Sequence, residues 1–377
     1  MGTGWELNLD RETFLAQHWQ RKPLLIRDSI TNFSTPLSRD ALSGLALEEM
    51  VESRIIEQRD SRWLRHHGPF NPADYARDVP WTLLVQAVDH YVEEVAELRR
   101  LIDFLPQWRV DDVMASFAVD GGSVGPHFDN YDVFLLQGEG VRLWKLGQFC
   151  DDSTPLVPHD ELCILASFDC QEEYLLSPGD MLYIPPGVAH WGIAKGDCTT
   201  FSIGFRAPRL NDMVSRWADQ LLQEMDAGQF YRDAGQSSVT RAGEIRAQDL
   251  QRAMSQLQGA LDQGASSHWF GELVTEPRYE PGSDEDDLAE ARALLAESAS
   301  FVALSPAAKL AWQQDLEGIA VFANGESRLF EEAVLPTVLQ LCESWRLEKQ
   351  ALQAASRQRA SAALLDFLLE TGCIYVE

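Results

Sequence analysis

The sequence lacks any paired-cysteine motif, because its six cysteines are scattered and none belongs to a CxxC pair. In a chain of 377 residues this spacing is typical of reduced thiols in a cytoplasm, not of a disulfide framework or a cysteine-rich zinc site. No apolar run reaches the roughly 18 residues that a membrane span needs. Met1–Glu6 shows neither a secretory signal pattern nor the Ser or Thr that myristoylation needs at position 6, so we expect neither.

Basic residues are also scarce, since 31 Lys and Arg stand against 59 Asp and Glu, a net charge of −28. Such a surface disfavours a phosphate backbone as the main partner and attracts a basic one. Taken alone, the charge favours the simpler interpretation that it only keeps the chain in solution. With 45% hydrophobic residues the chain can bury sizeable cores, and its length predicts two or three domains.

Short β-rich runs, separated by glycine, proline and aspartate, fill the segment between Asp112 and Arg206. Several short strands with turn signals between them predict an antiparallel barrel or a double-sheet sandwich. Ahead of them we expect a short helix that Pro23 stops, a strand over Leu24–Arg27, and mixed helical segments to about Phe104. The predicted barrel strands are Val113–Val119, Tyr131–Leu136, Val141–Leu146, Met181–Ile184 and Thr199–Phe205.

After Pro208 the pattern becomes helical. Asn211–Met225 and Ala247–Leu261 each carry an apolar stripe at helical spacing, which could cover the barrel or meet the same helices of another subunit. Gln263–Ser267 resembles a linker, and Asp284–Asp287 a solvated helix start.

The end of the chain predicts helices with a late β-hairpin, Ile319–Phe330, that turns at Asn324–Gly325. Helix Ala360–Leu369 and strand Cys373–Val376 follow. This arrangement is similar to a winged-helix module. Its Lys and Arg are scattered among many acids, so we expect it to face protein or to be structural.

Two histidines and one aspartate carry the predicted chemistry. His127 and Asp129 follow a glycine-rich turn, and residues two apart on a strand project from the same face, so both could reach one ion. Alone, a His-x-Asp triplet arises more often by chance. The segment Gly179–His190 is more specific, because it matches the second cupin motif, in which a Pro-Pro-Gly turn presents the histidine inward. The alternative is an ordinary hairpin with a surface histidine.

Two histidines and one carboxylate leave three adjacent coordination positions open, which predicts the facial triad of a non-haem iron(II) oxygenase. A structural zinc would close its shell with four protein ligands, and the sequence offers no evident fourth. We expect the other histidines at the surface or in packing: His18, His66, His67, His90, His159 and His268.

A 2-oxoglutarate cosubstrate also needs a cation for its distal carboxylate. Arg142 lies one hairpin after the triad, and its planar guanidinium can pair a carboxylate through two hydrogen bonds. Lys145 is the competitor, but its odd spacing predicts the opposite face of the strand. Ser116 could add a hydroxyl donor or be an ordinary core serine.

The chain resembles the Jumonji C (JmjC) oxygenases, and in particular the bacterial ribosomal oxygenases. The resemblance implies an α+β chain with a JmjC/cupin-type double-stranded β-helix barrel over 1–208, a helical dimerisation region over 209–265 and a winged-helix-like domain over 266–377. It implies Fe(II), 2-oxoglutarate and O2, with His127, Asp129 and His190 as iron ligands and Arg142 as the 2-oxoglutarate anchor. The segments that carry it are Trp19–Arg27, Asp111–Phe117, Gly125–Gly140, Gly179–His190 and Ser202–Pro208.

Members of this family hydroxylate a side chain of a ribosomal protein, and the bacterial branch acts on an arginine of large-subunit ribosomal protein sixteen. The related human enzymes use a lysine as the anchor, so Arg142 favours the bacterial branch. The resemblance also implies a cytoplasmic homodimer and a basic substrate, which gives the acidic charge a role. Asp120 and Asp132 are then candidates to hold the substrate guanidinium, or else turn caps.

Other functions remain open at the level of sequence. The same iron enzyme could be a lysine demethylase or a small-molecule hydroxylase, which the mass of modified ribosomal proteins would distinguish. A non-catalytic cupin-like binding protein would show no 2-oxoglutarate turnover with basic peptides. A winged-helix transcription regulator would bind DNA at physiological salt.

Overall fold

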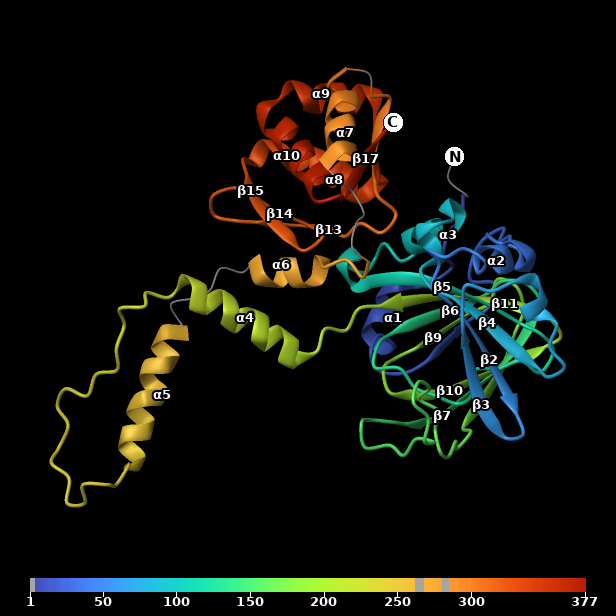
Figure 1. The fold of residues 1–377 in the computed structure, drawn as a ribbon, viewed down its shortest axis with the longest axis horizontal. Helices are drawn as coiled ribbons and strands as arrows, with labels where there is room; N and C mark the ends of the chain where they lie inside the picture. The colour runs from blue at the N-terminus through green and yellow to red at the C-terminus, as the bar shows by residue number, and fades with distance from the viewer. Residues whose placement is uncertain (1–3, 262–267, 280–284, 298) are drawn as a thin grey trace. The chain divides into compact units, whose positions relative to one another are not determined.

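The computed structural model describes residues 4–261, 268–279, 285–297 and 299–377 (Figure 1). The chain forms two compact units, Met1–Ala207 and Pro208–Glu377. The predicted first boundary, at 208, lies beside this division, whereas the predicted boundary at 265 and the linker Gln263–Ser267 lie outside the described residues. In the described parts of the chain, no helix has the length and apolar character to cross a membrane.

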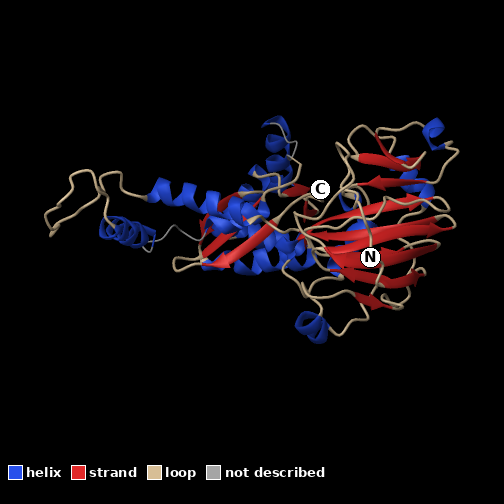
Figure 2. Cartoon of the chain, turned by 90° about the horizontal axis from the view of Figure 1, so that it is seen from below, coloured by secondary structure: helices blue, strands red, loops and turns tan. Residues whose placement is uncertain are grey.

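Two antiparallel sheets build the first unit, and their strands are the red arrows around the N label in Figure 2. The larger sheet has the order β1-β9-β6-β11-β5-β4-β2-β3 and the smaller has β10-β7-β8. The strands of the larger sheet are β1 (Leu24–Ile26), β2 (Ser53–Arg59), β3 (Arg62–His67), β4 (Trp81–Val85), β5 (Val110–Ala118), β6 (Val133–Gln137), β9 (Met181–Ile184) and β11 (Cys198–Phe205). Those of the smaller sheet are β7 (Val141–Phe149), β8 (Glu172–Leu176) and β10 (Val188–Lys195).

Alternating side chains on β6 show what each face of the larger sheet covers. Phe134 and Leu136 lie in the main core with Phe14 of α1, whereas Leu135 belongs to a second core with Trp144 of β7. The two sheets therefore pack face to face around an interior, as the predicted double-stranded β-helix requires. Because side chains along a strand alternate between its two faces, residues an even number of positions apart on one strand share a face.

The helices of this unit are α1 (Arg11–Gln17), α2 (Arg39–Leu45), α3 (Glu93–Arg100) and the short 3-10 turns η1 (Pro72–Tyr75), η2 (Val88–His90) and η3 (Gln107–Arg109).

The prediction of mixed helical segments before Phe104 is wrong for Ser53–Arg59, Arg62–His67 and Trp81–Val85, which form β2, β3 and β4. Their alternation is obscured in the sequence by Glu57 of β2, a charged residue that is nevertheless buried. Glu57 is 3% exposed because Arg77 binds it, with Nη1 to Oε2 at 2.7 Å. Helix α1 also ends at Gln17, earlier than the predicted stop at Pro23, before Gln20 adopts a left-handed conformation with φ of +54°.

The second unit combines helices with two small antiparallel sheets around a core of its own. The predicted hairpin is confirmed, with Asn324 and Gly325 at φ of +49° and +87°, as a tight turn between paired strands requires. Helix α7 begins at Glu285, within the predicted helix start, and Asp284 lies outside the described residues. The helices are α4 (Leu210–Glu224), α5 (Ala247–Leu261), α6 (His268–Thr275), α7 (Glu285–Glu297), η4 (Glu332–Val334), α8 (Leu335–Ser344), α9 (Lys349–Arg357) and α10 (Arg359–Glu370). The strands are β12 (Phe301–Leu304), β13 (Leu310–Gln314), β14 (Ile319–Ala323), β15 (Glu326–Phe330), β16 (Arg346–Glu348) and β17 (Ile374–Val376).

Candidate metal centre

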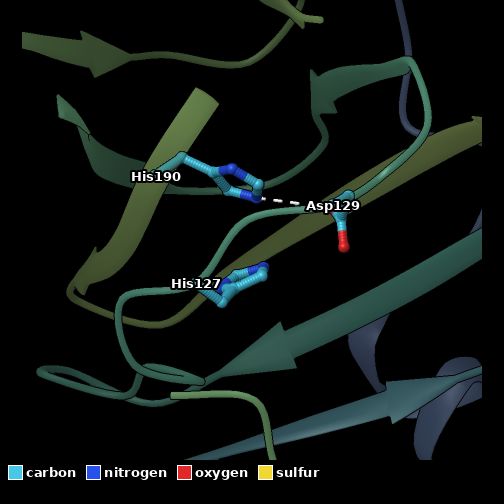
Figure 3. Close-up of side chains that lie close together, drawn as sticks. All are labelled: His127, Asp129 and His190. Atoms are coloured by element: carbon cyan, nitrogen blue, oxygen red, sulfur yellow. Dashed lines mark ion pairs between the residues drawn. The ribbon is translucent and has the colours of Figure 1, made fainter. Parts of the chain in front are cut away.

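The backbone places His127 directly opposite His190. His190 lies on β10, and the segment before β6 runs antiparallel to it. The backbone N–H of His127 donates to the carbonyl of His190 at 3.0 Å, and the backbone N–H of His190 donates to the carbonyl of His127 at 2.8 Å. Directly opposed residues of an antiparallel pair project from the same face. The two imidazole rings therefore lie together, with their centroids 4.2 Å apart (Figure 3).

Asp129 is held beside them by the Pro-Pro-Gly turn. The N–H of Gly187 donates to the carbonyl of Asp129 at 2.8 Å. Gly187 has φ of +79°, and a Cβ there would lie 2.6 Å from the Phe149 ring, so the turn requires glycine. One carboxylate oxygen of Asp129 lies 3.6 Å from Nε2 of His190, and one ligand atom from each of the three residues lies within 4.8 Å of the others. Figure 3 shows the three side chains converging on one region.

The Nδ1 atom of each histidine forms a hydrogen bond with the backbone carbonyl two residues earlier in the chain. Nδ1 of His127 lies 2.9 Å from the carbonyl oxygen of Gly125, and Nδ1 of His190 lies 3.0 Å from that of Val188. A carbonyl only accepts hydrogen bonds, so Nδ1 of each ring is the donor and Nε2 is the nitrogen left to face a metal. Burial, with His127 as a second cause, lowers the pKa of His190 to about 4, so this ring is neutral near pH 7. Two imidazole nitrogens and one carboxylate suit a divalent transition metal with open positions.

Replacing Gly125 tests whether these carbonyls orient the site. Its φ is +84°, and a Cβ would lie 2.8 Å from Ile164 and 3.0 Å from Trp63, so Gly125→Ala should displace the carbonyl that fixes His127. We expect metal affinity, measured by titration with Mn(II), to fall about 10- to 100-fold. Gly196→Ala is the matched control, because φ there is +77° but nothing lies within 4 Å of the added Cβ. Equal loss in both variants would assign the effect to backbone strain alone.

Strand β7 separates its two cationic residues onto opposite faces, as predicted. Arg142 is 3% exposed and shares the inner face with Leu146, which pairs with His190 in the sheet. Lys145 lies on the other face and forms an ion pair with Glu173 at 2.7 Å. Within the described residues, Nε and Nη2 of Arg142 are buried without a hydrogen-bond partner. A buried guanidinium with unused donors is costly, and an anion would satisfy it.

Ser116 lies on the inner face of β5, toward the same end of the interior as Arg142. Its neighbour on that face, Ala118, packs against Ala194, which is the sheet partner of Arg142. The hydroxyl of Ser116 donates to the Thr200 carbonyl at 3.4 Å, a long bond that a better acceptor could replace. The cosubstrate role of Ser116 stays a prediction.

The structure contradicts the substrate role predicted for Asp132. This residue lies two positions before Phe134 and therefore on the same face of the larger sheet. It is fully buried there, on the main-core side and away from the triad. Its carboxylate accepts hydrogen bonds from Tyr183 Oη at 2.6 Å, Gln20 Nε2 at 2.9 Å and Arg109 Nη2 at 3.1 Å. Burial, together with this carboxylate, raises the pKa of Tyr183 far above its usual value. Through these three hydrogen bonds Asp132 stabilises the fold.

Asp120 is exposed, and one of its oxygens accepts the N–H of Gly196 at 2.7 Å, in the turn between β10 and β11. Asp120 therefore caps this turn, which is one of the two roles predicted for it. Its other predicted role, contact with the substrate guanidinium, stays a prediction.

Sequence reasoning missed two aromatic residues near the triad. Tyr131 is 41% exposed as a whole, yet the Asp129 carboxylate, followed by burial, raises the pKa of its hydroxyl far above the usual value. Trp144 lies on the inner face beside His190, with ring centroids 5.9 Å apart. Trp144 lies two residues from Arg142 on β7, so strand alternation could have placed it on the inner face, whereas Tyr131 lies in a bend outside the strands.

Comparisons with known proteins agree with this geometry. The JmjC domain family matches residues 97–213, the ROXA-like winged helix matches 259–375, and the AraC-like ligand binding domain matches 167–279. A ribosomal protein uL16 3-hydroxylase of Escherichia coli is 38% identical over 73% of this chain and 74% of its own length.

Solved structures of YcfD, a ribosomal oxygenase from Escherichia coli, are similar over the whole chain. One has 32% identity and a TM-score of 0.81 with 100% of both chains covered. Another, in complex with cobalt and 2-oxoglutarate, has 32% identity and a TM-score of 0.81 with 99% of both covered. The chain therefore belongs to the ribosomal oxygenase family of JmjC-domain proteins.

Proposed function

We propose that this protein is an iron(II)- and 2-oxoglutarate-dependent oxygenase that hydroxylates an arginine side chain of ribosomal protein uL16. The observation that carries the cofactor assignment is the convergence of His127, Asp129 and His190 on the barrel face that also bears Arg142. The substrate assignment is supported by the Escherichia coli relative, which is named as a uL16 hydroxylase. The name of this relative does not specify the modified residue, so the assignment to arginine rests on the family resemblance.

His127, Asp129 and His190 would hold the metal, and three protein ligands would leave coordination positions for the cosubstrate and dioxygen. Arg142 binds the distal carboxylate of 2-oxoglutarate through Nε and Nη2, two donors of one planar group. Ser116 supplies a further hydroxyl at that end. Lys145 cannot share this task because it lies outside the barrel with Glu173.

Iron with 2-oxoglutarate and dioxygen supplies the oxidising power that hydroxylates an unactivated carbon, releasing succinate and carbon dioxide. The chain itself positions the reactants and excludes water. Leu146, the sheet partner of His190, belongs to an apolar cluster that also contains Leu135 and Leu182. Asp120 remains the candidate contact for the substrate guanidinium, and the net charge of −28 attracts a basic protein segment.

A homodimer through α4 and α5 is the second part of the proposal. Helix α5 contains no buried residue, and its stripe leaves Leu250, Met254 and Leu257 between 56% and 61% exposed. On α4, Leu222 is 68% exposed. Uncovered apolar stripes on helices mark a partner surface, and the same helices of a second copy would fit them. Sedimentation equilibrium should then give twice the 42.3 kDa of one chain, and a mass of one chain would contradict the dimer.

A ribosomal substrate implies action in the cytoplasm. The acidic balance disfavours nucleic acid as the main partner, and we assign the winged-helix domain a protein-facing or structural role.

The test is incubation of the protein with iron(II), 2-oxoglutarate and fragments of uL16, read by mass spectrometry. We expect the mass of one added oxygen atom on a single arginine, with stoichiometric succinate. Fragments in which that arginine is lysine are the control and should stay unmodified. Oxygen added to another residue type would overturn the arginine assignment, and no modification of any uL16 fragment would overturn the substrate.

A further inference from the structure

A second buried donor lies between Arg142 and the triad. Trp144 is 5% exposed, and within the described part of the chain its indole Nε1 has no hydrogen-bond partner. A buried tryptophan N–H almost always finds an acceptor. Because this group only donates, whatever satisfies it must present an acceptor atom and cannot be a cation.

The surroundings of Trp144 place this donor in the same region of the barrel as the predicted cosubstrate. The guanidinium carbon of Arg142 lies 5.8 Å from the centre of the indole ring, and the His190 ring centroid lies 5.9 Å from it. The three residues share one face of the smaller sheet, in which Trp144 pairs with Gly192. Trp144 therefore adjoins both the anchor and a metal ligand.

The contact with Gly192 positions the indole ring of Trp144. A Cβ at this position would lie 2.8 Å from Cη2 of Trp144, so the benzo edge rests directly on the glycine backbone. A side chain at 192 would push the ring away from the sheet. This contact fixes the plane of the indole, and with it the position of the unused N–H.

We propose that the indole N–H of Trp144 donates a hydrogen bond to a carboxylate oxygen of 2-oxoglutarate. It is thereby a binding residue for the cosubstrate in addition to Arg142. The inference rests on the proposed function, since it names a further contact to the same cosubstrate. It joins the two sets of unused donors on this face, Nε and Nη2 of Arg142 and Nε1 of Trp144, in one anion-binding subsite.

Trp144→Phe removes the donor and keeps an aromatic ring against Gly192. Calorimetry of 2-oxoglutarate binding to Zn(II)-loaded protein should show about tenfold weaker affinity, the loss typical of a hydrogen bond to a charged group. Trp191→Phe is the matched control. Its Nε1 donates to Ser123 Oγ at 2.8 Å, and it pairs with Lys145 on the outer face, so its affinity should equal that of the wild type.

A second measurement needs no variant of altered stability. In wild-type protein with 15N-labelled tryptophan, the indole proton with nuclear Overhauser contacts to His190 should move downfield when 2-oxoglutarate is added. Wild-type affinity in Trp144→Phe, or no movement of this signal, would overturn the inference and leave a buried water as the acceptor. If the wild type itself binds no 2-oxoglutarate, the proposed function fails instead.

Discussion

His190→Ala is expected to abolish substrate-dependent succinate formation. The variant loses the one ligand that lies on a barrel strand, and with it the neutral Nε2 that the bond from Nδ1 to the Val188 carbonyl aims at the metal. Loss of an outer-shell partner alone costs about 10- to 100-fold, so loss of the ligand itself should lower turnover by more than about 100-fold. Succinate release with a uL16 fragment measures this directly.

The matched control for His190→Ala is His67→Ala. His67 lies on the edge strand β3, with its side chain 55% exposed and paired with Glu161 at 2.8 Å. Its removal should leave succinate formation and metal affinity unchanged. Normal turnover in His190→Ala would refute the metal site.

Arg142→Met should raise the KM for 2-oxoglutarate by about a hundredfold. Two charge-assisted hydrogen bonds contribute roughly 1.5 kcal/mol each, and every 1.4 kcal/mol is about a tenfold change in affinity. Methionine keeps the length of the side chain, so the apolar packing around Trp144 should survive. Initial rates at varied 2-oxoglutarate give the KM.

The same variant should gain stability when no cosubstrate is present. Arg142 has two buried nitrogens without partners in the described structure, and an apolar side chain removes that penalty. We expect the free energy of unfolding to rise by on the order of 1 kcal/mol. Lys145→Met, on the outer face, should change neither KM nor stability by a comparable amount. A lower stability together with an unchanged KM would contradict the anchor.

The triad could be predicted from sequence because its geometry is local. A His-x-Asp spacing puts two side chains on one face, and the Pro-Pro-Gly turn fixes the direction of His190. Arg142 and Lys145 could be assigned to opposite faces for the same reason, since parity along one strand needs no tertiary information. The strand Met181–Ile184 and the helix Ala247–Leu261 match the structure at both ends.

What the sequence could not predict depends on contacts between distant segments. Asp132 was a candidate substrate residue because an arginine substrate needs a negatively charged partner. Tyr183 and Gln20, 51 and 112 residues away, show that it faces the opposite side of the sheet. The strands between Ser53 and Val85 were missed because Glu57 is buried only through its pairing with Arg77. Trp144 carries no signal in the sequence that separates an ordinary core aromatic from a donor without a partner.

The division of the chain at Ala207 has a consequence for heat stability. Every proposed ligand of the metal and the cosubstrate belongs to the first unit, whereas the second unit has a hydrophobic core of its own. A ligand stabilises only the folded structure that binds it. Calorimetric melting should therefore show two transitions, and addition of Mn(II) with 2-oxoglutarate should shift only the transition of the barrel.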